Sequence, residues 1–90
     1  SDMSIFSFHP VKHLTTAEGG AITTNSKELY EKLLILRNHG MVKTPNMKPW
    51  EYELRELGFN YRISDIQCAL GLSQLNKLDN FIQKRVAIAK

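Results

Sequence analysis

The sequence has few of the features that mark disulfide-bonded, membrane or repeat proteins. It contains one cysteine, Cys68, which excludes an internal disulfide and any CxxC metal motif. No stretch approaches the roughly 18 apolar residues of a membrane-spanning helix. No signal-peptide pattern is present, and no segment repeats. We therefore expect a cytoplasmic protein in which Cys68 is a buried or half-buried thiol.

Neither sign of charge dominates the sequence. Twelve Lys and Arg stand against nine Asp and Glu, a net charge of +3, and the basic residues are scattered. This balance suits an anionic ligand such as a phosphate or nucleotide and does not require a nucleic acid. The 90 residues allow one small domain with little room for a deep cavity. Because an apolar run follows the first residues at once and a helical pattern continues to the last, we expect both ends to be cut from a larger protein.

Three kinds of chemistry lack their motifs. Lys12 precedes the Gly19-Gly20 pair, and the GxxxxGK[ST] spacing of a phosphate loop is absent. Pro10 lies between His9 and His13 and prevents the helix that would bring two HxxxH rings onto one metal ion. No GxSxG elbow is present, so a hydrolase triad is not predicted either. We expect no metal site.

The apolar pattern at the start of the chain predicts two short strands. Residues 3–8 (MSIFSF) are apolar and aromatic, and they indicate a buried strand that Pro10 ends, because proline has no backbone N–H. Residues 20–24 (GAITT) begin with the second glycine of the Gly19-Gly20 pair and predict a second strand.

A first helix is predicted after the second strand. Asn25 and Glu28 have the spacing of a capping box, and leucines recur after them at helical intervals. Gly40 is placed to end this helix in a left-handed conformation. Residues 41–59 are of mixed polarity with two prolines, and we interpret them as a long irregular loop that is functional or orders against a partner.

Helical periodicity returns in the last third of the chain. Ser64 and Gln67 form a second capping-box pattern, and apolar residues recur with a helical period over residues 64–90. The pattern fits one long helix or two with a break near Asp79-Asn80. We interpret Gly71 as a position of close packing within this helical segment.

Lys12 is the first candidate for chemistry. A lysine amine held unprotonated is a nucleophile that can bond to an aldehyde cofactor. Because side chains alternate along a strand, Ser7 points away from Phe6 and Phe8, and its hydroxyl is placed to bind a phosphate on the same cofactor. The other interpretation is an ordinary surface lysine after a turn, and from these residues alone that interpretation is favoured.

The segment before the second capping box is the other candidate. Asn60 and Arg62 stand near a predicted helix N-terminus, where an amide and a guanidinium can hold a phosphate or carboxylate. A loop-to-helix junction with a solvated arginine is the alternative. Residues 67–73 are faintly similar to a helix-turn-helix core, although the residues after them are rich in leucine. A non-enzymatic basic helical module that binds DNA or a protein partner therefore remains open.

Four blocks of sequence, in order, carry a family resemblance. SFHPVK, TTAEGGAITTN, LRNHG and GFNYRISDIQCALGLSQLNKLD closely resemble the DegT/DnrJ/EryC1/StrS family of sugar aminotransferases, which are fold-type I enzymes dependent on pyridoxal 5'-phosphate. The resemblance covers residues 1–90. It implies an α/β fragment of the large domain, with two strands and then helices. From about residue 64 a helix would lead to the small domain.

The resemblance also implies roles for single residues. Lys12 aligns with the lysine that bonds covalently to the cofactor and moves protons during catalysis. Ser7 aligns with a contact to the cofactor phosphate, and Asn60 with a residue that reaches this phosphate across the dimer interface. Arg62 and His9 are assigned to substrate. Beside them, Glu18-Gly19-Gly20 is expected to hold the strand behind the lysine.

The implied reaction is transfer of an amino group, with L-glutamate as the expected donor, to a nucleotide-linked keto sugar. The HPVK motif most resembles that of family members that aminate a UDP-linked 4-keto-6-deoxy-N-acetylhexosamine on the way to pseudaminic acid. The resemblance implies a homodimer with a shared active site, and no nucleic-acid or membrane partner. Since the family's upstream cofactor contacts are absent from these residues, we expect the 90-residue chain alone to be inactive.

Overall fold

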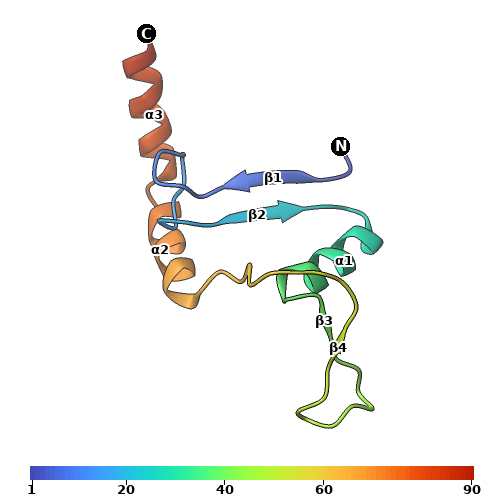
Figure 1. Ribbon diagram of the computed structural model, residues 1–90. Helices are drawn as coiled ribbons and strands as arrows, with labels where there is room; N and C mark the ends of the chain where they lie inside the picture. Colours follow the sequence, from blue (N-terminus) through green and yellow to red (C-terminus); the bar gives the residue numbers. More distant parts are fainter. The chain divides into compact units, whose positions relative to one another are not determined.

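The computed structural model describes all of residues 1–90 and contains short strands and three helices (Figure 1). Two compact units are present: residues 1–3 with 23–62, and residues 4–22 with 63–90. In chain order the elements are β1 (Ser4–Ser7), β2 (Gly20–Thr23), α1 (Lys27–Arg37), β3 (Met41–Val42), β4 (Glu53–Leu54), α2 (Asp65–Leu75) and α3 (Leu78–Ala89).

Strands β1 and β2 form a two-stranded sheet, and their arrows run in opposite directions in Figure 1. Just beyond β1, the Phe8 N–H donates to the Gly19 carbonyl at 2.9 Å and continues the pairing. Both predicted strands are confirmed, each slightly shorter than expected. The expectation that the first strand is buried is wrong, because no other part of this chain covers it: every β1 residue is exposed, and Ile5 is 79% exposed.

Helix α1 begins one residue later than the sequence predicted. Ser26 is its N-cap, with a hydroxyl that accepts from the Leu29 N–H at 3.3 Å, so the prediction of Asn25 as the cap is wrong. Ser26 has the extended backbone that lets a cap side chain reach back to the third helical N–H. At the other end Gly40 is left-handed, as predicted, and its N–H donates to Ile35 O at 2.9 Å.

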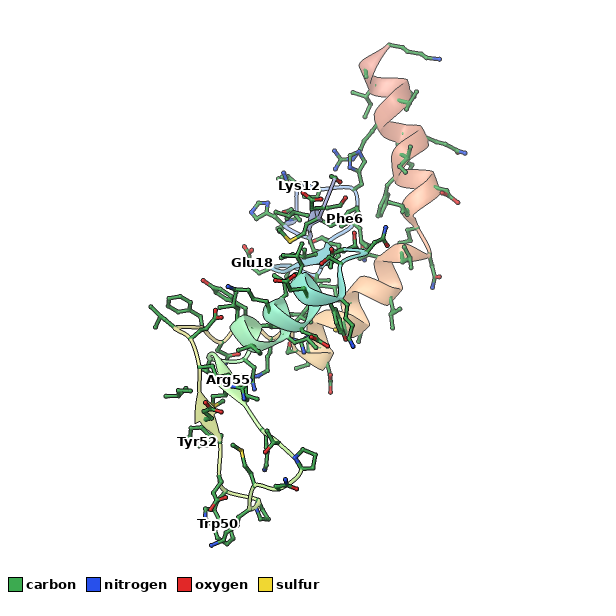
Figure 2. The ribbon with its side chains drawn as sticks, turned by 90° about the vertical axis from the view of Figure 1, so that its right-hand side faces the viewer. Phe6, Lys12, Glu18, Trp50, Tyr52 and Arg55 are labelled. Carbon is green, nitrogen blue, oxygen red and sulfur yellow. The ribbon has the colours of Figure 1, made fainter.

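The segment predicted as an irregular loop contains a small hairpin. Met41 of β3 pairs with Leu54 of β4 in antiparallel register, and the Arg55 N–H donates to Gly40 O at 3.0 Å. The tip carries Trp50 and Tyr52, both exposed (Figure 2). The prediction is wrong at this hairpin because two-residue strands are too short to show a hydrophobic period.

The last third of the chain forms two helices. The capping box predicted for Ser64 and Gln67 is confirmed with both of its hydrogen bonds. The break lies at Asn76 and Lys77, earlier than predicted. Asp79 and Asn80 instead stand in the first turn of α3, where an acidic side chain favours the helix dipole. No helix here has the combination of length and hydropathy that crossing a membrane requires.

The chain encloses no hydrophobic core of its own, since no hydrophobic residue is buried. The buried side chain is polar: Thr16, at 3% exposure, lies in the connection between β1 and β2. Cys68 is exposed, which overturns the expectation of a buried thiol. Its turn of α2 has no covering layer within these 90 residues.

Candidate active site

Lys12 stands on a turn that follows β1 (Figure 2). Its own backbone N–H donates to the His9 carbonyl at 3.0 Å and closes the turn. The residue is exposed and lines an open concavity of about 730 Å³, together with Phe81 and Arg85 of α3. The lysine amine is therefore accessible to a small molecule that enters this concavity.

Hydrogen bonds at the base of the Lys12 turn hold its two ends together. The Phe8 carbonyl accepts from the Thr16 N–H at 3.0 Å and from Thr15 Oγ1 at 2.9 Å. Thr16 Oγ1 donates to Glu18 O at 2.8 Å, which satisfies this buried hydroxyl. The backbone that carries Lys12 thus leaves and rejoins the sheet at defined points.

Helix α2 contacts the connection between β1 and β2 that carries Lys12. Gln67 Nε2 donates to Glu18 O at 2.8 Å, while its Oε1 accepts from the Ser64 N–H at 2.9 Å. Gly71 is buried against Thr16, and a Cβ at this position would lie 2.9 Å from Thr16 Cγ2. The interpretation of Gly71 as a close-packing position is confirmed.

Ser7 and His9 lie in the same unit as Lys12. Ser7 Oγ accepts from the His9 N–H at 3.4 Å, and its hydroxyl hydrogen has no acceptor within this unit. His9 Nε2 lies 4.0 Å from Glu18 Oε1, and both side chains are largely exposed. Lys12 has an accessible amine and Ser7 a hydroxyl free to donate, which are the group types that an aldehyde cofactor carrying a phosphate requires; Ser7 does not line the concavity beside Lys12.

Asn60 and Arg62 belong to the other unit, where they are joined to the end of α1. Asn60 forms an isolated antiparallel bridge with Asn38, and the Arg62 guanidinium donates to Asn38 Oδ1. Asn60 Oδ1 accepts from the Arg62 N–H at 3.4 Å, and its amide nitrogen makes no hydrogen bond within this unit. This amide is a donor available to an anion.

The LRNHG and GFNYR blocks contact each other through their backbones. The His39 N–H donates to Phe59 O at 3.0 Å. Gly58 lies so close to the end of α1 and the turn after it that a Cβ on Gly58 would lie 2.8 Å from both Leu36 O and the His39 carbonyl carbon. Only glycine allows the two backbones this approach.

Sequence reasoning missed two residues that contact the predicted site residues and assigned a third only part of its role. Arg85 donates to the Val11 and Lys12 carbonyls, Asn38 accepts from Arg62, and Gln67 was recognised only as a cap. No local pattern marks Arg85, because 73 positions separate it from Lys12.

An exposed lysine on a braced turn after a strand, with a serine hydroxyl five residues before it, is compatible with an α/β protein that binds a cofactor through lysine. The family model described as the DegT/DnrJ/EryC1/StrS aminotransferase family matches residues 1–90. The chain belongs to this family, and the α/β fold class inferred from the resemblance is confirmed.

Within this family, the chain is similar to individual sugar aminotransferases. The chain is 54% identical over 88 residues to the UDP-4-amino-4,6-dideoxy-N-acetyl-beta-L-altrosamine transaminase of Campylobacter jejuni, covering 98% of this chain and 23% of that protein. Helicobacter pylori PseC, an aminotransferase involved in the biosynthesis of pseudoaminic acid, superposes with a TM-score of 0.77 at 49% identity, over 88% of this chain and 20% of that one.

A third relative is the cofactor form of a sugar aminotransferase. The PLP-form of Spr1654 from Streptococcus pneumoniae, assigned as a sugar aminotransferase, superposes with a TM-score of 0.78 at 35% identity, over 99% of this chain and 23% of that chain. The chain thus spans less than a quarter of the length of these relatives. The alternative of a basic helical module that binds DNA or a protein has no support from them.

Proposed function

We propose that these residues are part of a pyridoxal 5'-phosphate-dependent aminotransferase, at the end of its large domain, with the helices from residue 64 leading toward a small domain. The observation that carries the proposal is Lys12, exposed on a braced turn in a chain of this family. When bound, the cofactor supplies an aldehyde that bonds to an amine and a ring that takes up negative charge.

Lys12 has two tasks in this proposal. Its Nζ would hold the cofactor through the aldehyde group. The same amine, when free, would act as general base and then general acid, and would move the proton that leaves the donor Cα. Supporting this assignment, the turn holds Lys12 at the wall of an open concavity.

The remaining site residues bind and orient. Ser7, with its free hydroxyl hydrogen, donates to the cofactor phosphate. Asn60, with its free amide nitrogen, donates to the phosphate held by a second copy of the chain, so the enzyme is a homodimer with a shared site. Arg62 and His9 contact the substrate. We place the enzyme in the cytoplasm.

The relatives support the choice of sugar acceptor, whereas the amino donor rests on the family resemblance. L-Glutamate donates the amino group and leaves as 2-oxoglutarate, and a UDP-linked 4-keto-6-deoxy-N-acetylhexosamine accepts it at the keto carbon. The relative from Campylobacter jejuni, named for a UDP-linked amino sugar, and PseC support this choice.

The full-length protein that carries these residues tests the proposal. We expect pyridoxal 5'-phosphate followed by borohydride to leave one reduced adduct, on the peptide that contains Lys12. Lys12→Ala should remove both this adduct and the transfer of ¹⁵N from labelled glutamate to the sugar. Lys27→Ala is the matched control, because Lys27 lies exposed on α1 and pairs only with Glu31, and it should change neither.

Two results would contradict the proposal. An adduct on a different lysine of the wild-type protein would remove Lys12 from the chemistry. Transfer of ¹⁵N to a GDP-linked keto sugar in preference to the UDP-linked one would keep the enzyme class and overturn the substrate.

A further inference from the structure

The Lys12 turn is contacted by a side chain from the far end of the chain. Arg85 on α3 directs one guanidinium nitrogen, Nη2, to two consecutive carbonyl oxygens, 3.0 Å from Val11 O and 3.3 Å from Lys12 O. All of these residues belong to the same compact unit.

These carbonyls lie where the turn has little support of its own. Between residues 9 and 14 there is a single backbone hydrogen bond, from Lys12 N–H to His9 O. The Val11 and Lys12 carbonyls accept no backbone donor. Arg85 is therefore the contact that restrains the C-terminal half of the turn, directly at the backbone that carries the Lys12 side chain.

Arginine is suited to this contact for a geometric reason. Its guanidinium is planar, always charged and rich in donors, and hydrogen bonds from a charged donor are stronger than neutral ones. Both carbonyls are reached by Nη2 alone, whose two N–H groups diverge in the guanidinium plane as a fixed fork, whereas a lysine ammonium has the same charge on a flexible stem with N–H groups that rotate. The contact depends on shape as well as on charge.

We propose that Arg85 is a positioning residue for Lys12, which holds the turn so that the lysine amine meets the aldehyde of an incoming cofactor in a reactive orientation. This inference rests on the proposed function. Small displacements of a reacting group lower rates strongly, since orientation supplies a large part of the rate enhancement. Arg85 itself need not touch the cofactor.

The test uses the full-length apoprotein and two readouts. The first is the rate at which added pyridoxal 5'-phosphate bonds to Lys12, measured by borohydride trapping of the adduct on the peptide that contains Lys12. The second, independent of any cofactor, is hydrogen exchange of the amides in residues 9–13. We expect Arg85→Gln to slow labelling by about tenfold and to speed exchange in this segment. Arg85→Lys should recover only a minor part of both, because it keeps the charge without the fork.

Lys77→Gln is the matched control. It removes a positive charge at the start of α3 from an exposed side chain that makes no hydrogen bond, and both readouts should stay at the wild-type level. If Arg85→Gln lowers the melting temperature so far that the variant cannot be compared with the wild-type protein, both measurements are made on Arg85→Lys instead.

Each outcome separates the inference from the proposed function. If the wild-type protein takes no label on Lys12, the proposed function fails, whereas faster exchange in the Arg85 variants still demonstrates the restraint. If wild-type Lys12 is labelled and Arg85→Gln labels equally fast, or exchange is unchanged, the positioning role is refuted. Full recovery by Arg85→Lys refutes the role of the planar fork.

Discussion

At the residue scale, polar side chains join segments that are far apart in the sequence. Arg62 donates to Asn38 Oδ1 across 24 positions, and the bridge between Asn38 and Asn60 lies directly beside this bond. Asn60 is the proposed phosphate donor, so the side-chain pair next to it braces the backbone on which that donor stands.

A double-mutant cycle measures this pair. We expect Asn38→Ala and Arg62→Lys to be coupled by about 0.5–1.5 kcal/mol in the free energy of unfolding, because each variant alone removes the same hydrogen bond. The exposure of Arg62 places the value in the range for ordinary hydrogen bonds, below that for buried charged ones. Urea unfolding of the full-length protein provides the four free energies.

Asn46→Ala combined with Arg62→Lys is the control cycle, because Asn46 lies exposed in the hairpin tip and has no hydrogen bond to Arg62. Its two effects should add. Additive effects for Asn38 and Arg62 as well would mean that the contact contributes nothing to stability.

At the element scale, helix α2 fixes the connection between β1 and β2. The helix begins at the Ser64 capping box, and the position where Gly71 lacks a side chain faces Thr16. Thr16 cannot move aside easily, because it is buried and its hydroxyl is bonded to Glu18 O. The helix and the connection therefore pack at a distance that only a glycine permits.

Gly71→Ala tests this packing. In an exposed helix the change would stabilise by about 1 kcal/mol through helix propensity. Here the new Cβ would lie 2.9 Å from Thr16 Cγ2, and overpacking typically costs about 1–3 kcal/mol. We expect a net loss of about 1 kcal/mol, seen as a lower midpoint of urea unfolding. Ser73→Ala on an exposed face of α2 should be neutral or slightly stabilising, and a stabilising Gly71→Ala would show that Thr16 yields.

At the scale of the whole chain, apolar surface is exposed on nearly every element. No hydrophobic residue is buried. Ile5 of β1, Ile66 of α2 and Ile88 of α3 are all more than three-quarters exposed. Large exposed apolar patches on soluble proteins mark surfaces that other protein covers.

We expect the 90-residue chain, expressed by itself, to self-associate and to show no aminotransferase activity. Sedimentation velocity should show species larger than a monomer that grow with concentration. Ile5→Lys, which places a charge on the exposed strand β1, should reduce this association, as charged residues do on sheet edges. A stable monomer across a broad range of concentration, or transfer of an amino group by this chain, would contradict the expectation.

Local patterns were enough to predict several elements and one packing site. Both strands, the Ser64 cap and the left-handed Gly40 follow from residue types and spacing along a few consecutive positions. Boundaries were less accurate, as at Ser26 and at the break before α3, because neighbouring polar residues compete for the same capping role. The roles of Lys12, Ser7, Asn60, Arg62 and His9 stay predictions from the resemblance.

The sequence by itself determined the first two strands, the helices, the family and which lysine stands after the first strand, because these depend on local preferences and on motifs that can be read along the chain. Only the tertiary structure decided that Arg85 holds the Lys12 turn, that Asn38 holds Arg62, and that β3 and β4 pair. The physical reason is that the partners in the first two contacts lie far apart in the sequence, so no local spacing indicates which residue meets which. Strands β3 and β4 are too short to show a hydrophobic period.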